Sequence, residues 1–314
     1  MGWGFKREKT EQGWLSISMR PDSLSYVHGW RNGGGKCAIL RCGTQALGGE
    51  FEGAERVARD LGFSRYQCST LLEQGQYQVL QVEAPNVPQI ELRTAIRWRV
   101  KDLLDYHVDD ATIDVLDVPP DPGGGGRTHY MYAIAAQNAL ILDCIGRFEA
   151  AKIPLKVIEV EETAQRNVAA LYESGNRGIA LLHVGERSGL LTINFRGELY
   201  LARRIDTGMK QLLAAPEGGA REEILGRIAL EVQRTFDHFD RQFPFVALEK
   251  LLLGPEPEAS GLAAHLSQNL GLPVEPVRLG DALGFDAGIS LDAEGEWRMF
   301  HLLGAALRHE EKAL

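Results

Sequence analysis

The chain has 314 residues, 44% of them hydrophobic, and a formal net charge of −9. This length is enough for one large domain or two lobes with a substantial core, while the acidic balance argues against general binding to DNA or RNA. No stretch approaches eighteen consecutive apolar residues and the N-terminus has no apolar signal core, so we expect a cytosolic protein without a membrane span.

The first elements predicted along the chain are three strands, at 14–20, 23–31 and 36–42, joined by turns at 20–22 and 32–35. A helix is predicted over 50–61, because apolar residues recur at helical spacing and Gly62 can end it. Strands at 67–72 and 77–83 follow. We assign residues 1–83 to a first lobe, which 154–177 and the C-terminal helix complete.

An insertion is predicted at 84–153. Its first helix, 89–106, should bury a stripe of apolar residues at helical spacing, namely Leu92, Ile96, Val100, Leu103 and Leu104. A strand at 111–118, an exposed hairpin tip at 119–126 and a strand at 127–136 come next. Asn138 is then expected to cap a second helix that runs to 151.

The second lobe, 178–314, repeats the order of the first. Three strands at 179–184, 189–195 and 198–204 precede a helical region at 222–239, a strand at 248–253, a helix at 259–270 and a strand at 273–277. The two copies of this order lie about 165 residues apart, and such repeats indicate duplicated α/β lobes that face a cleft.

Three stretches carry a resemblance to a known family. They are VEAPNVPQIELRTAIRWRVKDLLDYHVDDATIDVLDV (82–118), GIALLHVGERSGLLTINFRGELYLARRIDTG (178–208) and ILGRIALEVQRTFDHFDRQFP (224–244), the last with Glu231, Arg234 and Thr235 in an E-x-x-R-T pattern. The chain resembles the actin-like PilM family of type IV pilus assembly, and within it the MshI-type members of mannose-sensitive haemagglutinin (MSHA) pili. The resemblance implies an α/β, actin-like fold. It also implies two RNase H-like lobes, a small inserted IC subdomain as in FtsA, and a IIB subdomain at about 215–245.

The resemblance also locates a nucleotide site. Family members that bind ATP carry D-x-G at two hairpins, where the aspartates hold Mg²⁺ through water and the glycines admit phosphates. Here Ser18 and His183 stand at the aspartate positions and Arg20 at the first glycine position, while Gly185 survives. The residues that would contact a nucleotide, if the site is retained, are Ser18, Ser23, His183, Gly185, Ser188, Gly208 and Gly254.

Because both metal-positioning carboxylates are missing, we expect no ATP hydrolysis and assign no catalytic residue. ATP and Mg²⁺ would be cofactors only if the cleft still functions. Asp22 and Asp206 could substitute for the aspartates or could simply be turn residues. His183 could serve a metal or acid–base role, or could be a hydrogen-bonded structural residue. No metal site is predicted, since the four cysteines form no C-x-x-C pair and no cluster with histidine.

The helix at 89–106 carries the candidate partner site. Trp98 falls opposite its apolar stripe and is flanked by Arg93, Arg97 and Lys101, a composition typical of binding hot spots. Trp98 could instead pack against the first lobe. The resemblance implies a cytoplasmic protein beside the inner membrane that binds the short cytoplasmic tail of a PilN-type bitopic membrane protein; other pilus assembly proteins are further candidate partners.

Direct contact with the membrane could come from the N-terminus, where Trp3 and Phe5 neighbour basic residues, or this segment could be a frayed end. The leading hypothesis is an assembly scaffold with a degenerate nucleotide site and only peripheral membrane contact. One alternative is an active ATPase of the same fold. Another is a sugar or metabolite kinase, which would need a catalytic aspartate between the lobes.

Overall fold

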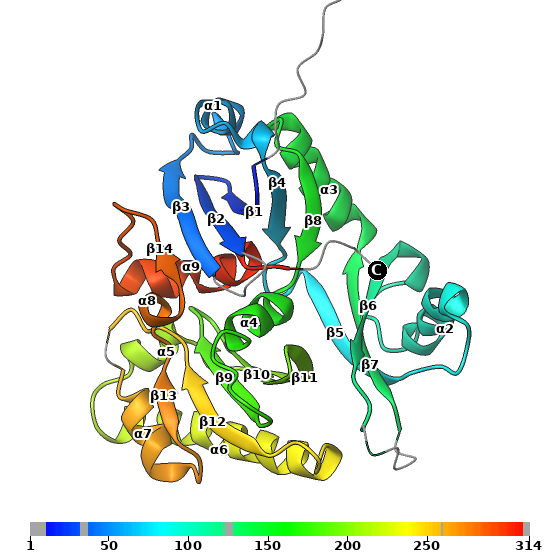
Figure 1. The fold of residues 1–314 in the computed structure, drawn as a ribbon, viewed down its shortest axis with the longest axis vertical. Coiled ribbons are helices and arrows are strands. Elements are labelled where there is room, and N and C mark those ends of the chain that lie inside the picture. The colour runs from blue at the N-terminus through cyan, green and yellow to red at the C-terminus, as the bar shows by residue number, and fades with distance from the viewer. Residues whose placement is uncertain (1–10, 32–36, 122, 124–127, 259, 310–314) are drawn as a thin grey trace, which may run out of the picture.

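The computed structural model describes residues 11–31, 37–121, 123, 128–258 and 260–309. Two lobes, each built on a mixed sheet, are joined by central helices, and a smaller three-stranded sheet lies beside them (Figure 1). Within the described residues, no helix is long and apolar enough to cross a membrane.

The first lobe contains a six-stranded sheet in the order β14-β3-β2-β1-β4-β8. The strands β1 (Trp14–Arg20), β2 (Ser23–Arg31) and β3 (Cys37–Ala46) are antiparallel, whereas β4 (Gln67–Leu71), β8 (Leu155–Glu159) and β14 (Gly284–Phe285) join in parallel. The helix predicted to begin at residue 50 begins later, as α1 (Ala54–Asp60). Glu50 and Phe51 have φ values of 60° and 67°, which a right-handed helix cannot contain.

The second lobe contains a five-stranded sheet in the order β11-β10-β9-β12-β13. The predicted strands appear as β9 (Gly178–Val184), β10 (Gly189–Phe195), β11 (Glu198–Ile205), β12 (Leu248–Leu253) and β13 (Val274–Pro276). The helices α5 (Met209–Ala214), α6 (Gly219–Gln242) and α7 (Leu262–Asn269) accompany them. The segment at 215–245, expected to form subdomain IIB, consists mainly of α6, whose apolar face belongs to the core of this lobe.

Two helices, α4 (Glu161–Ala169) and α9 (Ala293–Ala306), pack against each other between the two sheets. The crossing is close because Gly304 lies directly against the backbone carbonyl of Ala164, where any side chain would clash. One apolar cluster runs through both lobes here and includes Val27, Ile179 and Phe300. The short helix α8 (Leu279–Ala282) and β14 lead the chain back to the first lobe, where α9 packs against β1, β2 and β4.

The inserted sheet has the order β5-β7-β6 and is antiparallel throughout. Its strands are β5 (Tyr77–Glu83), β6 (Ala111–Val118) and β7 (Tyr130–Gln137). The sequence analysis placed residues 77–83 in the first lobe. Among the described strands, however, β5 pairs only with β7 of the inserted sheet. The predicted boundary between the first lobe and the insertion, after residue 83, is therefore wrong, because the insertion begins one strand earlier.

The inserted helices differ from the prediction at their ends. Helix α2 (Gln89–Val100) stops six residues early, and Leu103, predicted to be buried, is 52% exposed beyond it. Helix α3 (Asn138–Ala150) follows β7 directly, and Asn138 is its first residue instead of its cap. The Asn138 amide donates to the Asp109 carbonyl and so ties α3 to the 3-10 turn at Val108–Asp110.

The insertion contacts both lobes. The Tyr132 hydroxyl donates to the Tyr200 carbonyl (3.2 Å) and accepts from the Ala202 amide (3.1 Å), which joins β7 to β11 of the second lobe. Phe148 of α3 belongs to the core of the first lobe. Helix α2 covers the outer side of the inserted sheet, away from both lobes (Figure 1).

Candidate functional site

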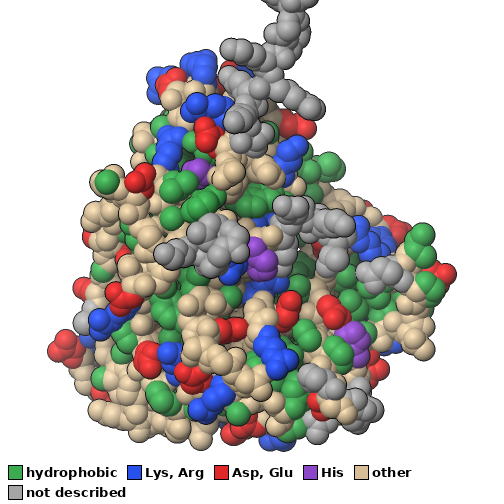
Figure 2. Space-filling model, in the orientation of Figure 1, with side chains coloured by type: hydrophobic (Ala, Val, Ile, Leu, Met, Phe, Trp, Pro, Cys, Tyr) green, Lys and Arg blue, Asp and Glu red, His purple; other side chains and the backbone are tan. Residues whose placement is uncertain are grey.

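The two hairpin turns predicted to hold phosphates line one cleft between the lobes. Arg20 and Pro21 of the β1–β2 turn and Gly185 to Ser188 of the β9–β10 turn border a cavity of about 710 Å³. The Ser188 hydroxyl donates to the side-chain oxygen of Gln74, a bond from one lobe to the other. Basic and acidic side chains are interspersed on the face of the molecule that Figure 2 shows.

The seven predicted nucleotide residues do not form one surface. His183, Gly185 and Ser188 line the cleft, whereas Ser18 lines a different cavity, described below. Gly208 packs tightly on the backbone of Glu186 and Arg187. Ser23 donates a hydrogen bond to its neighbour Asp22, in the exposed β1–β2 turn.

Three backbone donors at or near the β9–β10 turn are engaged within the protein. The Gly185 N–H donates to the Ser188 carbonyl (2.9 Å), within the turn. The first N–H groups of α5 also point at this turn, since Met209 donates to the Gly185 carbonyl and Lys210 to the Glu186 carbonyl. A phosphate that bound to any of these three donors would have to displace a protein hydrogen bond.

His183 is buried and stacks on Phe300, with ring centroids 4.4 Å apart. Burial, and then the nearby His301, hold the pKa of His183 well below its ordinary value, so the ring is neutral at pH 7. A neutral imidazole offers neither a carboxylate for Mg²⁺ nor a positive charge for phosphate. A side chain at Gly254 would come within 2.7 Å of His183 Nδ1, so this glycine makes room for the histidine. Among the described residues, no group of three or more His, Cys, Asp or Glu side chains could hold a metal ion.

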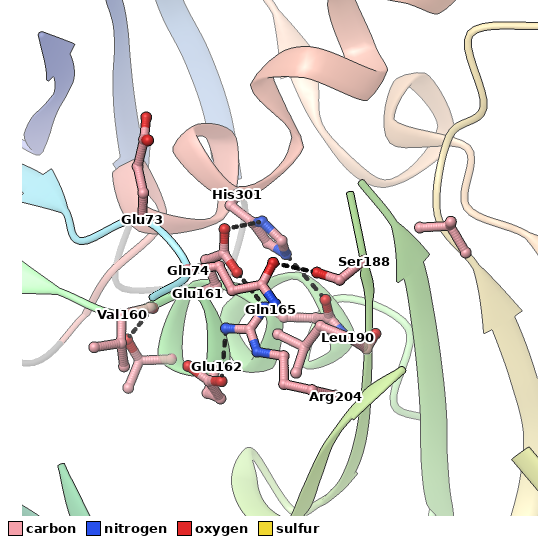
Figure 3. A network of polar contacts seen from close by, with 12 residues as sticks. Glu73, Gln74, Val160, Glu161, Glu162, Gln165, Ser188, Leu190, Arg204 and His301 are labelled. Atoms are coloured by element: carbon pink, nitrogen blue, oxygen red, sulfur yellow. Dashed lines mark hydrogen bonds and ion pairs between the residues drawn. The ribbon is translucent and has the colours of Figure 1, made fainter. Parts of the chain in front are cut away.

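A buried group of charges lies at the base of the cleft (Figure 3). Arg204 of β11 forms ion pairs with Glu161 and, at 2.9 Å, with Glu162, the first two residues of α4. Its guanidinium also donates to the Tyr77 hydroxyl of β5 (2.6 Å), which in turn donates to Glu162 (2.7 Å). His301 of α9 lies 3.6 Å from Glu161. We call these five residues the Arg204 cluster.

The charges in the Arg204 cluster stabilise one another. Burial alone would raise the pKa of Glu161, but His301 and Arg204 hold it at about 2. Burial likewise opposes the charge on Arg204, yet Glu162, Tyr77 and Glu161 raise its pKa above the ordinary value. Glu161 therefore stays ionised at neutral pH, with Arg204 as its counter-charge in the wall of the cleft.

Gln165, one turn along α4, fixes the orientation of His301. Its amide NH₂ donates to the carbonyls of Leu181 (2.8 Å) and Leu190 (3.0 Å) and to the Thr192 hydroxyl. Its oxygen is left to accept from His301 Nε2 at 3.1 Å. This turns the other ring nitrogen of His301 towards Glu161.

The four predicted partner residues lie on α2 or directly after it, outside the cleft. Trp98 is 69% exposed, so it does not pack against the first lobe, and the Lys101 ammonium lies 5.2 Å from its ring centre. Arg97 donates to the carbonyls of Val108 (2.6 Å) and Ala111 (3.0 Å) and therefore holds the inserted subdomain together. Arg93 pairs with Asp114 of β6 at 3.2 Å.

A second cavity, of about 180 Å³, separates α3 from the first lobe. We call it the α3 groove. Its lining combines apolar and basic side chains, namely Met19, Phe51, Leu72, Leu140, Phe148, Arg20 and Arg147, with Ser18 and other residues of β1 and β4. No residue of α2 contributes to it, so the predicted partner residues and the groove beside the first lobe are separate features.

The sequence matches no family model and no curated relative. Among solved structures, the chain resembles one chain of the PilM-PilN type IV pilus biogenesis complex, with 17% identity, a TM-score of 0.69, and coverage of 96% of this chain and 98% of that one. A Bacteroides thetaiotaomicron protein with an actin-like ATPase fold and unknown function gives 10% identity and a TM-score of 0.49, over 88% and 93% of the two chains. The cytoplasmic domain of EpsL, an inner-membrane component of the Vibrio cholerae type II secretion system, gives 13% identity and a TM-score of 0.44, over 94% of each chain. The prediction of an actin-like α/β fold is confirmed.

The sequence did not single out the Arg204 cluster. Two signals were present: a pair of acidic residues, Glu161 and Glu162, opens a helix shortly after a strand, and Arg204 follows Arg203 near the end of a strand. Neither signal indicates which residues pair with each other, because the members of the cluster are far apart in the chain; Tyr77 and Arg204, for example, are separated by 127 residues.

Replacing Arg204 with methionine should lower the free energy of unfolding by about 3–5 kcal/mol, because two buried carboxylates lose their counter-charge. Arg203→Met is the matched control. Arg203 is the preceding residue of β11, it is more exposed, and its pairing with Glu231 spans 3.4 Å, so its loss should cost about 1 kcal/mol or less. Urea unfolding of both variants checks this, and equal effects would contradict it.

Glu161 should make stability fall in acid. Its folded pKa of about 2 lies below the ordinary value of 4.5, so its contribution is complete above pH 4.5 and is lost as the pH falls towards 2. Glu161→Gln should be less stable at neutral pH and should lose less stability across that window. Glu186→Gln, at an exposed carboxylate in the same cleft, should retain the wild-type profile. Melting temperatures measured from about pH 6 to about pH 2.5 distinguish these outcomes.

Proposed function

We propose that this protein is a cytoplasmic scaffold of type IV pilus assembly that docks the cytoplasmic tail of an inner-membrane PilN-type protein. The observation that carries the proposal is the fold, which follows a chain of the PilM-PilN complex over nearly the full length of both chains. The sequence stretches at 82–118 and 178–208 support an MSHA-type pilus as the assembly served.

We further propose that the nucleotide site is degenerate. Two observations support this: His183 is neutral and buried where an aspartate would hold Mg²⁺, and the Gly185 N–H is bonded within its own turn. The Arg204 cluster supplies an electrostatic tie between the lobes in place of a bound nucleotide. Catalysis of phosphoryl transfer depends on a positioned metal ion, and the described residues of this cleft offer no group of side chains that could hold one.

The α3 groove is the docking site that we propose for the tail. Its volume of about 180 Å³ suits one or two side chains of an extended peptide, which would be inserted between α3 and the first lobe. Phe148 and Leu140 offer apolar contact, and Arg147, which pairs with Asp143 and lies 5.0 Å from the Phe51 ring, offers further N–H donors at the rim. Because a tail peptide loses entropy when it becomes ordered, a few such anchors must supply most of the affinity.

Calorimetry with a PilN-type tail peptide tests this site. Leu140→Arg should weaken binding tenfold or more, about 1.4 kcal/mol, because it fills the groove with a charged side chain. Leu142→Arg makes the same change two residues further along α3, at a side chain that is 67% exposed and outside the groove lining, and should bind like the wild type. Melting temperatures of both variants separate lost binding from lost folding.

Calorimetry with Mg-ATP, together with an assay of ATP turnover, tests the nucleotide site. Mg-ATP should bind weakly or not at all, and the purified protein should show no ATP turnover above background. Turnover that disappears in Gly185→Trp, a change inside the cleft, would contradict this and support an active ATPase.

For the docking site, tail-peptide binding that is unaffected by Leu140→Arg would refute the α3 groove.

A further inference from the structure

Exposed apolar side chains are concentrated on and around the outermost helix of the insertion. Among the described residues, six large apolar side chains are exposed, and four of them lie between residues 87 and 103: Val87, Ile90, Trp98 and Leu103. Ile90 is 91% exposed and Trp98 is 69% exposed. Such apolar surface on a helix that covers nothing further marks an interaction surface.

Two of these exposed side chains, Ile90 and Trp98, share one face of α2, whereas Val87 and Leu103 flank the helix at its two ends. Residues 90, 94, 98 and 101 recur at intervals of three or four, so they lie on the side opposite Leu92, Ile96 and Val100, which form the buried stripe. Neither the cleft between the lobes nor the α3 groove includes a residue of α2, which separates the face from both sites described above.

The charge on α2 contrasts with that of the whole chain. From residue 89 to residue 101 there are four basic residues and one acidic residue, and Asp102 and Asp105 follow directly after them. The chain as a whole carries a net charge of −9. Arg93 and Arg97 are engaged with the β6 side of the insertion. Within the described part of the chain, Arg99 and Lys101 form no ion pair, and Lys101 lies over the Trp98 ring.

We propose that the outer face of α2 is a contact surface for an anionic lipid membrane. An exposed aliphatic side chain, a tryptophan and Lys101 on one helix face, with the exposed Arg99 at its flank, form a composition that favours a bilayer surface, where the indole lies at the headgroup level and the cations meet anionic lipid. A short peptide is less well matched, because peptides are held in concave sites, and both cavities described above lie away from α2.

Lipid contact through α2 is weak by itself. Ile90 and Trp98, with the cations of Arg99 and Lys101, give reversible binding, and stable attachment takes a second tether. The contact would orient the insertion towards the bilayer, whichever second tether holds the protein there. The proposal does not depend on the pilus function, because pure lipid vesicles suffice to test it.

Co-sedimentation of the full chain with vesicles provides the test. Vesicles that mix phosphatidylglycerol with phosphatidylcholine should bind the protein on the order of tenfold better than phosphatidylcholine alone, and high salt should remove the difference. The double variant Ile90→Asp/Trp98→Glu should lose binding to the anionic vesicles. The control Leu142→Asp/Leu230→Glu makes the same changes at two exposed leucines on α3 and α6 and should bind like the wild type.

Two further variants complete the design. Arg99→Glu/Lys101→Glu should also lose binding to the anionic vesicles. Trp3→Ser/Phe5→Ser, in the N-terminal segment that lies outside the described residues, should retain it.

The proposal is overturned if the wild type does not bind anionic vesicles, if Ile90→Asp/Trp98→Glu still binds, or if only the N-terminal variant loses binding. A loss of tail-peptide affinity or of self-association in Ile90→Asp/Trp98→Glu, without vesicle binding by the wild type, would assign the face to a protein partner.

Discussion

The arrangement of the molecule depends on a partly buried guanidinium, that of Arg204. Arg204 extends from an edge strand of the second lobe and meets two carboxylates at the start of α4 and a hydroxyl from the inserted sheet. Removing these charges from water is costly, and that cost is offset only when all partners are in place. The Arg204 cluster therefore specifies how the second lobe, the central helix and the insertion sit together.

This constraint connects the fold to the proposed function. Duplicated lobes with a cleft between them are suited to opening and closing around a ligand, as in nucleotide-driven machines. Here the cleft holds a neutral histidine, an ionised glutamate and a direct bond from Ser188 to Gln74 across the lobes. A rigid pair of lobes presents its α3 groove and α2 face in fixed positions, which is the property a scaffold needs.

Local sequence patterns predicted much of the fold, and they failed where distant segments pair. The alternation of apolar residues placed most of the strands of both lobes within a few residues, and the repeated order indicated duplicated lobes. Tyr77–Glu83 has a strand pattern, but nothing in that pattern states that it joins the inserted sheet. For the same reason the Arg204 cluster, whose members come from four different elements, could not be assembled from spacing alone.

The candidate site was predicted only in part. Family resemblance identified His183, Gly185 and Ser188, which do line the cleft, because they follow one another along a single hairpin. The composition around Trp98 suggested a partner role for Arg97, but it could not show that this guanidinium binds carbonyl groups of its own subdomain, because side-chain patterns do not reveal backbone acceptors.

The central claim is that protein charges, and not a nucleotide, hold the lobes together. Amide hydrogen exchange of the β1–β2 turn, the β9–β10 turn and α4, measured with and without saturating Mg-ATP, tests it most directly. The account predicts the same protection in both conditions, because the contacts between the lobes are complete without a ligand. A marked slowing of exchange in both turns on addition of Mg-ATP would contradict it.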